Sequence, residues 1–177
     1  MGEFDFLKEN SFTHIILGGS GEISISEKNK IGKQWKMISR AFPFLKRSIG
    51  KNANMLGICL GHQILAFLLG AGIKSLPEQK EVGTYKIYLS KDGKKDKIFK
   101  GFPSSFLAQE GHKDVVVNLP KEASLLATSK RCKVQAFRFK NAVGVQFHPE
   151  LSVEDVKFRL SFYSDYAFKK RVFIKIY

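Results

Sequence analysis

The sequence predicts an α/β fold, in which helices flank a mostly parallel sheet and an additional antiparallel β region follows. In the first half of the chain, short apolar segments alternate with longer segments of helical periodicity, the pattern of a parallel sheet with helices on its faces. After Val82, short strand-like segments follow one another without helices between them. A length of 177 residues fits one domain, which we expect to span residues 1–177.

The alternating half begins with the apolar segment 13–17, which reads as a buried strand. It runs into Gly18-Gly19-Ser20-Gly21, a loop whose backbone can approach a ligand closely. Residues 34–48 carry apolar side chains at helical spacing, so we expect a helix there, kinked at Pro43.

The second strand begins at Met55 and leads into Gly57-Ile58-Cys59-Leu60-Gly61-His62-Gln63. Glycines on both sides of the cysteine allow a sharp turn, so this segment has the composition of a nucleophile elbow. A helix is expected over residues 60–69, ended by Gly70-Ala71-Gly72. The free N–H groups of its first turn would point at the thiol and lower its pKa from about 8.5 toward 7 or below.

The second half is expected to contain short strands and a final helix. The strand-like segments are 84–89, 105–109, 114–118, 125–129, 134–139 and 142–147, with Asn141 closing a hairpin between the last two. Ser152 with Asp155 three residues later is a helix-start signature. The apolar face of that helix would comprise Val153, Val156, Leu160, Tyr163 and Ala167. Residues 172–176 could add a last strand.

Composition argues against several classes of protein. The 30 Lys and Arg against 16 Asp and Glu give a net charge of +14. The basic runs do not interleave with aromatic residues in a recognised binding motif, so we interpret the charge as solvated surface and do not expect a nucleic-acid partner. Two cysteines cannot form a disulfide framework, and the longest apolar run, 64–73, is shorter than the roughly 20 residues that span a bilayer. We therefore expect a soluble cytoplasmic protein without a membrane partner.

A second motif, Gly144-Val145-Gln146-Phe147-His148-Pro149-Glu150, ends a strand with a histidine and a carboxylate two residues apart. Side chains at this spacing on extended backbone point the same way. Together with Cys59 they supply a nucleophile, a base and an orienting group. No metal site is expected, because no second ligand cluster has suitable spacing. Cys132 lies in a strand-like stretch without an elbow, and we expect it to be a core residue.

With both motifs in view, the chain resembles the class I glutamine amidotransferase family, and most closely its stand-alone members that are similar to the glutaminase part of GMP synthase. The match covers about residues 13–150, and the intermediate segments 81–83, 111–114 and 135–137 agree as well. The resemblance implies a flavodoxin-like sheet. Members usually place a strand, a helix and a second strand before the glycine loop, a unit of about 30 residues. Residues 1–12 are too few for it, so the fold is expected to be N-terminally shortened, with the 13–17 strand at an edge.

The resemblance implies that Cys59 attacks the side-chain amide of glutamine, releases ammonia and leaves a glutamyl thioester that water hydrolyses. His148 would act as general acid and base, and Glu150 would hold its imidazole in the required tautomer. The backbone N–H groups of Leu60 and Gly19 would stabilise the oxyanion.

The resemblance also implies how substrate and partner are bound. Gln63, by its place in the motif, would help to bind glutamine, and His112 lies in a loop that lines the substrate pocket in similar proteins; an ordinary loop role for His112 stays open. No cofactor is expected. Because 177 residues leave no room for a domain that activates the ammonia acceptor, a separate synthase would be the partner. Two other functions stay open: a γ-glutamyl hydrolase or peptidase, and a catalytically impaired remnant with a regulatory role.

Overall fold

The structure is a computed structural model, and it describes residues 12–21, 23–26 and 32–162. The strands are β1 (His14–Leu17), β2 (Asn54–Ile58), β3 (Gly72–Ser75), β4 (Glu81–Leu89), β5 (Ser105–His112), β6 (Asp114–Val117), β7 (Ser124–Ser129), β8 (Ala136–Phe139) and β9 (Ala142–Val145). The helices are α2 (Lys33–Ser39), α3 (Phe42–Gly50), α4 (Leu60–Leu68) and α5 (Val153–Phe162), with 3-10 turns η2 (Pro77–Gln79), η3 (Gly93–Lys95) and η4 (Lys97–Phe99).

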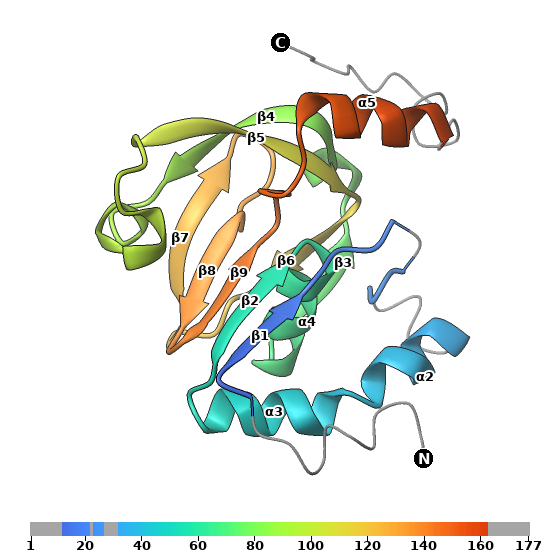
Figure 1. Cartoon of the computed structure of the whole chain (residues 1–177), viewed down its shortest axis with the longest axis vertical. Coiled ribbons are helices and arrows are strands. Elements are labelled where there is room, and N and C mark those ends of the chain that lie inside the picture. The colour runs from blue at the N-terminus through green and yellow to red at the C-terminus, as the bar shows by residue number, and fades with distance from the viewer. Residues whose placement is uncertain (1–11, 22, 27–31, 163–177) are drawn as a thin grey trace.

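The strands form a seven-stranded sheet in the order β1-β2-β9-β8-β7-β4-β5 and a separate pair, β3-β6. Strands β1, β2 and β9 run parallel, and the remaining ladders are antiparallel. The predicted α/β fold is confirmed, and the antiparallel strands continue the same sheet. Figure 1 shows α4 behind the parallel strands, the sheet curling toward β4 and β5, and α5 near their ends.

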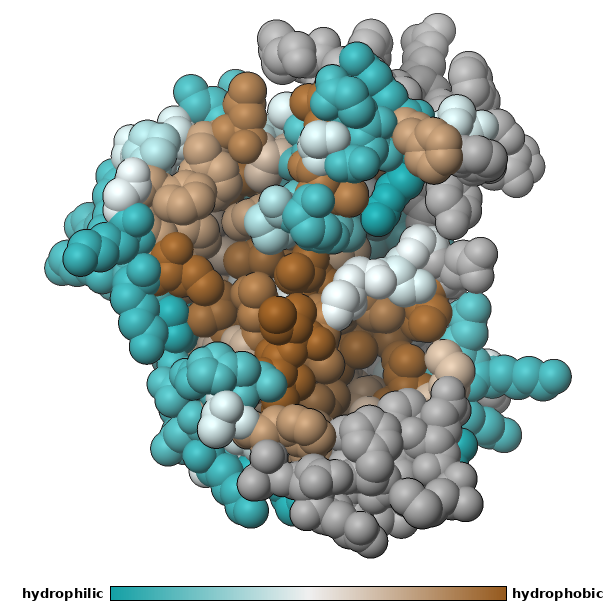
Figure 2. Space-filling view, viewed as in Figure 1, coloured by the Kyte–Doolittle hydropathy of each residue, from teal (hydrophilic) through white to brown (hydrophobic). Residues whose placement is uncertain are grey.

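Two apolar clusters occupy the two faces of the sheet. Met55 and Ala142 belong to the cluster that packs against α3 and α4, whereas Ile58 and Val143 belong to the cluster on the opposite face. Side chains alternate between faces along a strand, so each central strand contributes to both clusters. Figure 2 shows the second face, where apolar side chains gather across the sheet. Strands β2 and β9, which carry the two sequence motifs, are thus anchored on both sides.

The single helix predicted over residues 34–48 is wrong in one respect, because the structure has two helices there. Helix α2 ends at Ser39 and α3 begins at Phe42, with Pro43 in the first turn of α3. Proline is tolerated in a first turn because the N–H group that it lacks has no intrahelical acceptor there. The proline therefore starts a helix instead of kinking one.

The other helix predictions are confirmed within the described residues. Helix α4 follows Cys59 directly and is capped by Leu69 and Gly70, the latter at a φ of +94°. At the start of α5, the Ser152 hydroxyl accepts a hydrogen bond from the Asp155 N–H at 3.1 Å, and the Asp155 carboxylate accepts one from the Ser152 N–H at 2.8 Å. This is a reciprocal capping box. Tyr163, Ala167 and residues 172–176 lie outside the described residues.

Strand β1 lies at one edge of the sheet and, within the described residues, pairs only with β2. Ile16 on this strand is 71% exposed. The expected edge position of the 13–17 strand is therefore confirmed for the described chain, although its side chains are less buried than predicted. In the part of the chain that the structure covers, no helix is both long and apolar enough to cross a membrane.

Candidate active site

Cys59 occupies a strained turn between β2 and α4. Its φ of +50° and ψ of −101° lie in a region that non-glycine residues rarely adopt. A Cβ atom on Gly57 would lie 2.5 Å from the carbonyl carbon of Gly61, and one on Gly61 would overlap the carbonyl oxygen of Leu17. Only glycine fits at either position, because the ends of β1 and β2 and the start of α4 pack backbone against backbone. The predicted elbow geometry is present.

His148 reaches the same place from the segment after β9. Its N–H donates to the Gln109 carbonyl oxygen of β5 at 2.8 Å, which fixes its backbone against the sheet. Its Nδ1 lies 2.7 Å from Oε1 of Glu150. Because a carboxylate only accepts, this hydrogen bond assigns the proton to Nδ1 and leaves the lone pair of Nε2 for proton transfer.

The glycine loop after β1 completes the site. A Cβ atom on Gly19 would lie 2.8 Å from Cε1 of His148 and 3.3 Å from Cβ of Cys59. Gly19, Cys59 and His148 therefore meet at one point, where a larger residue than glycine would displace the imidazole. A cavity of about 420 Å³ opens beside them, and its lining includes Gly19, Cys59, Glu110, His148, Glu150 and Arg159.

The thiol of Cys59 is neutral in the resting protein. Burial is the main reason that its pKa is raised to about 12, and the negative charges of Glu110, Glu150 and Asp114 add to the effect. The N–H of Leu60, at the start of α4, lowers the pKa but by less than burial raises it. The expectation that this thiol ionises at rest is therefore wrong. The helix N-terminus is present, but it is outweighed by desolvation and by carboxylates that come from other parts of the fold.

Comparison with known proteins gives the family. The sequence model described as glutamine amidotransferase class-I matches residues 7–162. The chain belongs to the class I glutamine amidotransferases. A protein of Methanosphaera stadtmanae described as the glutamine-hydrolyzing subunit of GMP synthase is 33% identical over 150 residues, which cover 84% of this chain and 70% of that protein. The protein of the same description from Methanocaldococcus jannaschii is 39% identical over 108 residues, 59% of this chain and 55% of the relative.

Solved structures of the family have the same fold. A glutamine amidotransferase from Thermotoga maritima superposes with a TM-score of 0.72 at 28% identity and covers 91% of this chain, which in turn covers 69% of it. A protein from Thermoplasma acidophilum, described as a putative GMP synthase subunit, gives a TM-score of 0.67 at 25% identity, with 93% of this chain and 79% of that chain covered.

Two amidotransferase residues that the sequence placed at the substrate lie away from the cavity lining. Gln63 is buried, and its Nε2 donates to the Asp114 carbonyl oxygen at 2.9 Å and to Oε1 of Gln146 at 3.2 Å. His112 is also buried, with Nε2 at 3.4 Å from Oε2 of Glu81. Within the described residues, neither side chain lines the 420 Å³ cavity. Their roles in substrate binding stay predictions.

The cavity is also lined by two charged residues that sequence reasoning missed, Glu110 on β5 and Arg159 on α5. Burial and the neighbouring Glu81 carboxylate raise the pKa of Glu110 well above its usual range. One signal for Glu110 was available: it precedes His112 by two residues, so both side chains lie on the same face of one strand.

Proposed function

We propose that this chain hydrolyses the side-chain amide of glutamine and supplies the ammonia to a separate synthase. The observation that carries the proposal is the meeting of Cys59 on its elbow, His148 with its Nε2 free, and Gly19 at the mouth of one cavity. Membership of the amidotransferase family and the description of relatives as glutamine-hydrolyzing GMP synthase subunits support this choice of substrate and partner.

In the proposed reaction, Nε2 of His148 accepts the thiol proton as Cys59 Sγ attacks the amide carbon. The oxyanion that forms is held by the backbone N–H groups of Leu60 and Gly19, each worth about 3 kcal/mol in the transition state. His148 then gives its proton to the departing nitrogen, and ammonia leaves. Water attacks the thioester with His148 as base, which releases glutamate and restores the thiol.

The neutral resting thiol determines how the base must work. With a Cys59 pKa of about 12, very little thiolate exists at neutral pH before the substrate arrives. Proton transfer to His148 therefore accompanies attack on glutamine. Glu150 stabilises the imidazolium that forms, because its carboxylate already accepts the Nδ1 hydrogen bond.

The test is turnover by the purified chain with glutamine and, separately, with γ-glutamyl peptides, followed by the release of glutamate and ammonia. We expect release from free glutamine and a covalent adduct on Cys59 after exposure to a glutamine-mimicking electrophile, read by mass spectrometry. A strong preference for γ-glutamyl peptides would support the hydrolase or peptidase reading instead. A folded protein without the Cys59 adduct would support the regulatory remnant.

The partner can be tested in the same assay by adding a synthase chain that lacks its own glutaminase. Transfer of the glutamine amide nitrogen to the product of the synthase, followed with ¹⁵N-labelled glutamine, is the expected result. Free ammonium at high concentration should replace this chain, because the proposed role is the supply of ammonia. A synthase that uses glutamine equally well without the chain would contradict the partnership.

A further inference from the structure

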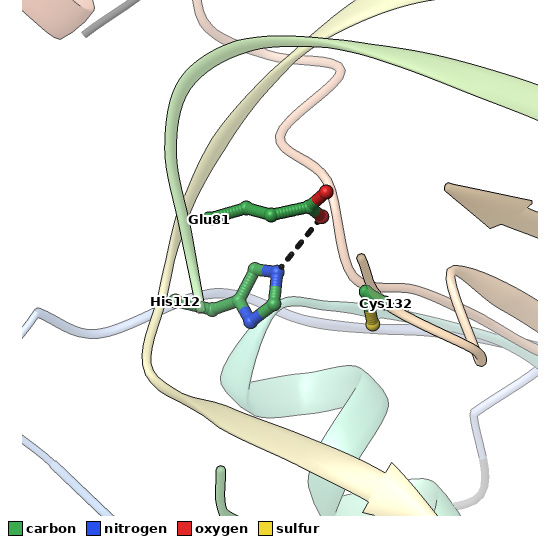
Figure 3. A group of neighbouring side chains, drawn as sticks. All are labelled: Glu81, His112 and Cys132. Carbon is green, nitrogen blue, oxygen red and sulfur yellow. Dashed lines mark hydrogen bonds and ion pairs between the residues drawn. The ribbon is translucent and has the colours of Figure 1, made fainter. Parts of the chain in front are cut away.

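A group of metal-ligand side chains lies in the core outside the proposed catalytic residues. Glu81 of β4, His112 of β5 and Cys132 of the β7–β8 connection are all buried, and one donor atom from each lies within 4.8 Å of the others. Figure 3 shows the Glu81 carboxylate and the His112 ring facing each other, with Cys132 beside them. Glu81 and His112 are register partners in the β4–β5 ladder, so the sheet itself places them together.

The hydrogen bonds of His112 require a positive charge beside its ring. Nδ1 lies 3.2 Å from the carbonyl oxygen of Asp114, which can only accept, so Nδ1 carries a proton. Nε2 then faces Oε2 of Glu81 at 3.4 Å and Oε2 of Glu110 at 3.5 Å. A neutral ring would oppose its lone pair to those of two carboxylates. A proton or a metal cation must lie between them.

Glu110 is the second sign of a missing cation. It is 1% exposed, and neither of its carboxylate oxygens has a hydrogen-bond partner among the described residues. Oxygens of Glu81, by contrast, accept from the Ser129 hydroxyl and the Gln135 amide, both at 2.6 Å. A buried carboxylate without donors is unfavourable unless it binds a proton or a cation. Glu110 points into the same space as His112 Nε2.

We propose that Glu81, His112 and Cys132 bind zinc or a similar divalent transition metal, with Glu110 as the fourth ligand. Imidazole nitrogen, thiolate sulfur and carboxylate oxygen are all zinc donors, whereas a thiolate excludes magnesium and calcium as the preferred ions. One carboxylate, one thiolate and a neutral imidazole balance the charge of a divalent cation, and Glu110 can coordinate through the carbonyl oxygen of its protonated carboxyl group. Binding displaces the thiol proton of Cys132 to solvent and forms the metal–sulfur bond without any change of oxidation state.

The geometry needs only a small adjustment. Zinc bond lengths of about 2.0–2.3 Å place the ligand atoms of a tetrahedral site roughly 3.3–3.8 Å apart. The donors lie within 4.8 Å, so a contraction of about 1 Å brings them into place. With four protein ligands and no open position, such a site is structural, and it would join β4 and β5 to the β7–β8 connection. The spacing of these residues in the sequence did not predict it.

The chain offers a matched pair of cysteines for the test. Protein stripped with a chelator is titrated with Co²⁺, and the near-ultraviolet absorption from thiolate-to-cobalt charge transfer is recorded. We expect the band to saturate at one equivalent in the unsubstituted protein and in Cys59→Ser, and to be absent in Cys132→Ser. Cobalt affinity should fall at least as much as the roughly 10–100-fold loss typical of outer-shell changes. Elemental analysis of the protein as purified should find one zinc.

Circular dichroism confirms that each variant is folded before its spectrum is interpreted. No band in the folded, unsubstituted protein with excess cobalt would overturn the proposal, and would mean that protons balance the buried charges. A band that survives Cys132→Ser but is lost in Cys59→Ser would overturn it as well, because the thiolate ligand would then belong to the elbow. Neither readout depends on glutamine hydrolysis.

Discussion

Cys59 and Cys132 are both buried thiols, 5% and 0% exposed, and burial raises the pKa of each. They differ in backbone and in neighbours. Cys59 has a positive φ and lies against the glycine loop and His148, at the edge of a cavity. Cys132 lies in a connection where its N–H donates to the Ser129 hydroxyl at 2.8 Å.

The difference teaches that burial does not separate a reactive thiol from an inert one. What separates these two is access to a cavity and to a base with a free nitrogen, both of which depend on the strained turn at Cys59. Cys132 has carboxylates and an imidazole nearby, but they are closed in the core and suited to holding a cation. One region is arranged to change its protonation state during turnover, and the other to keep its charges balanced.

The largest expected effect is the loss of glutamine hydrolysis in the elbow region. Cys59→Ser and His148→Ala should each lower kcat by about 10⁴–10⁶-fold, because the attacking group and its base act as one unit. For the same reason the double variant should be scarcely slower than either single variant. Steady-state release of glutamate measures this, with unfolding in urea to confirm that both variants keep their stability. Losses that multiply in the double variant would separate the two residues functionally.

A smaller effect, about 10²-fold in kcat, is expected from Gly19→Ala. The added methyl group would lie 2.8 Å from Cε1 of His148, so the imidazole must move away from the thiol. Gly18→Ala is the matched control, since a Cβ atom there has nothing within 4 Å. If both variants kept full activity, the contact between the glycine loop and His148 would have no role in turnover.

The raised pKa of Cys59 predicts how its reactivity depends on pH. Below the pKa, thiolate increases tenfold for each pH unit, so alkylation of the resting protein by iodoacetamide should rise about 100-fold from pH 7 to pH 9 without a plateau. Mass spectrometry locates the adduct on Cys59 or Cys132 and gives the rate. A plateau beginning near pH 7 would mean that the helix N-terminus outweighs burial after all.

The sequence was sufficient for the elbow and for the pairing of His148 with Glu150, because each depends on residues that are close in the chain. The resting pKa of Cys59 could not be predicted, since it depends on burial and on Glu110 and Asp114, which β5 and β6 bring from elsewhere. Strand β3 was missed because it is short and pairs with β6, a distant segment. The break before α3 was misplaced because proline suits both a kink and a first turn.

The group of Glu81, His112 and Cys132 was out of reach for the same physical reason. It depends on the β4–β5 register and on the path of the β7–β8 connection, neither of which leaves a local signal. Cys132 was expected to be a core residue, and it is fully buried. Its polar surroundings, however, come entirely from strands that are distant in the sequence.

The smallest effect separates the two regions by its kind. The Ser129 hydroxyl donates to Oε1 of Glu81 and accepts hydrogen bonds from the N–H groups of Arg131 and Cys132, so it ties the β7–β8 connection to β4. Ser129→Ala removes these bonds and should lower the free energy of unfolding by about 1–2 kcal/mol, measured in urea, with little change in kcat. Ser161→Ala, on exposed helix α5, is the control, because its hydroxyl bonds only to the Phe158 carbonyl oxygen of its own helix. A fall in kcat as large as that of Gly19→Ala would show that the two thiol regions are coupled, since strain around Cys132 would then reach the elbow.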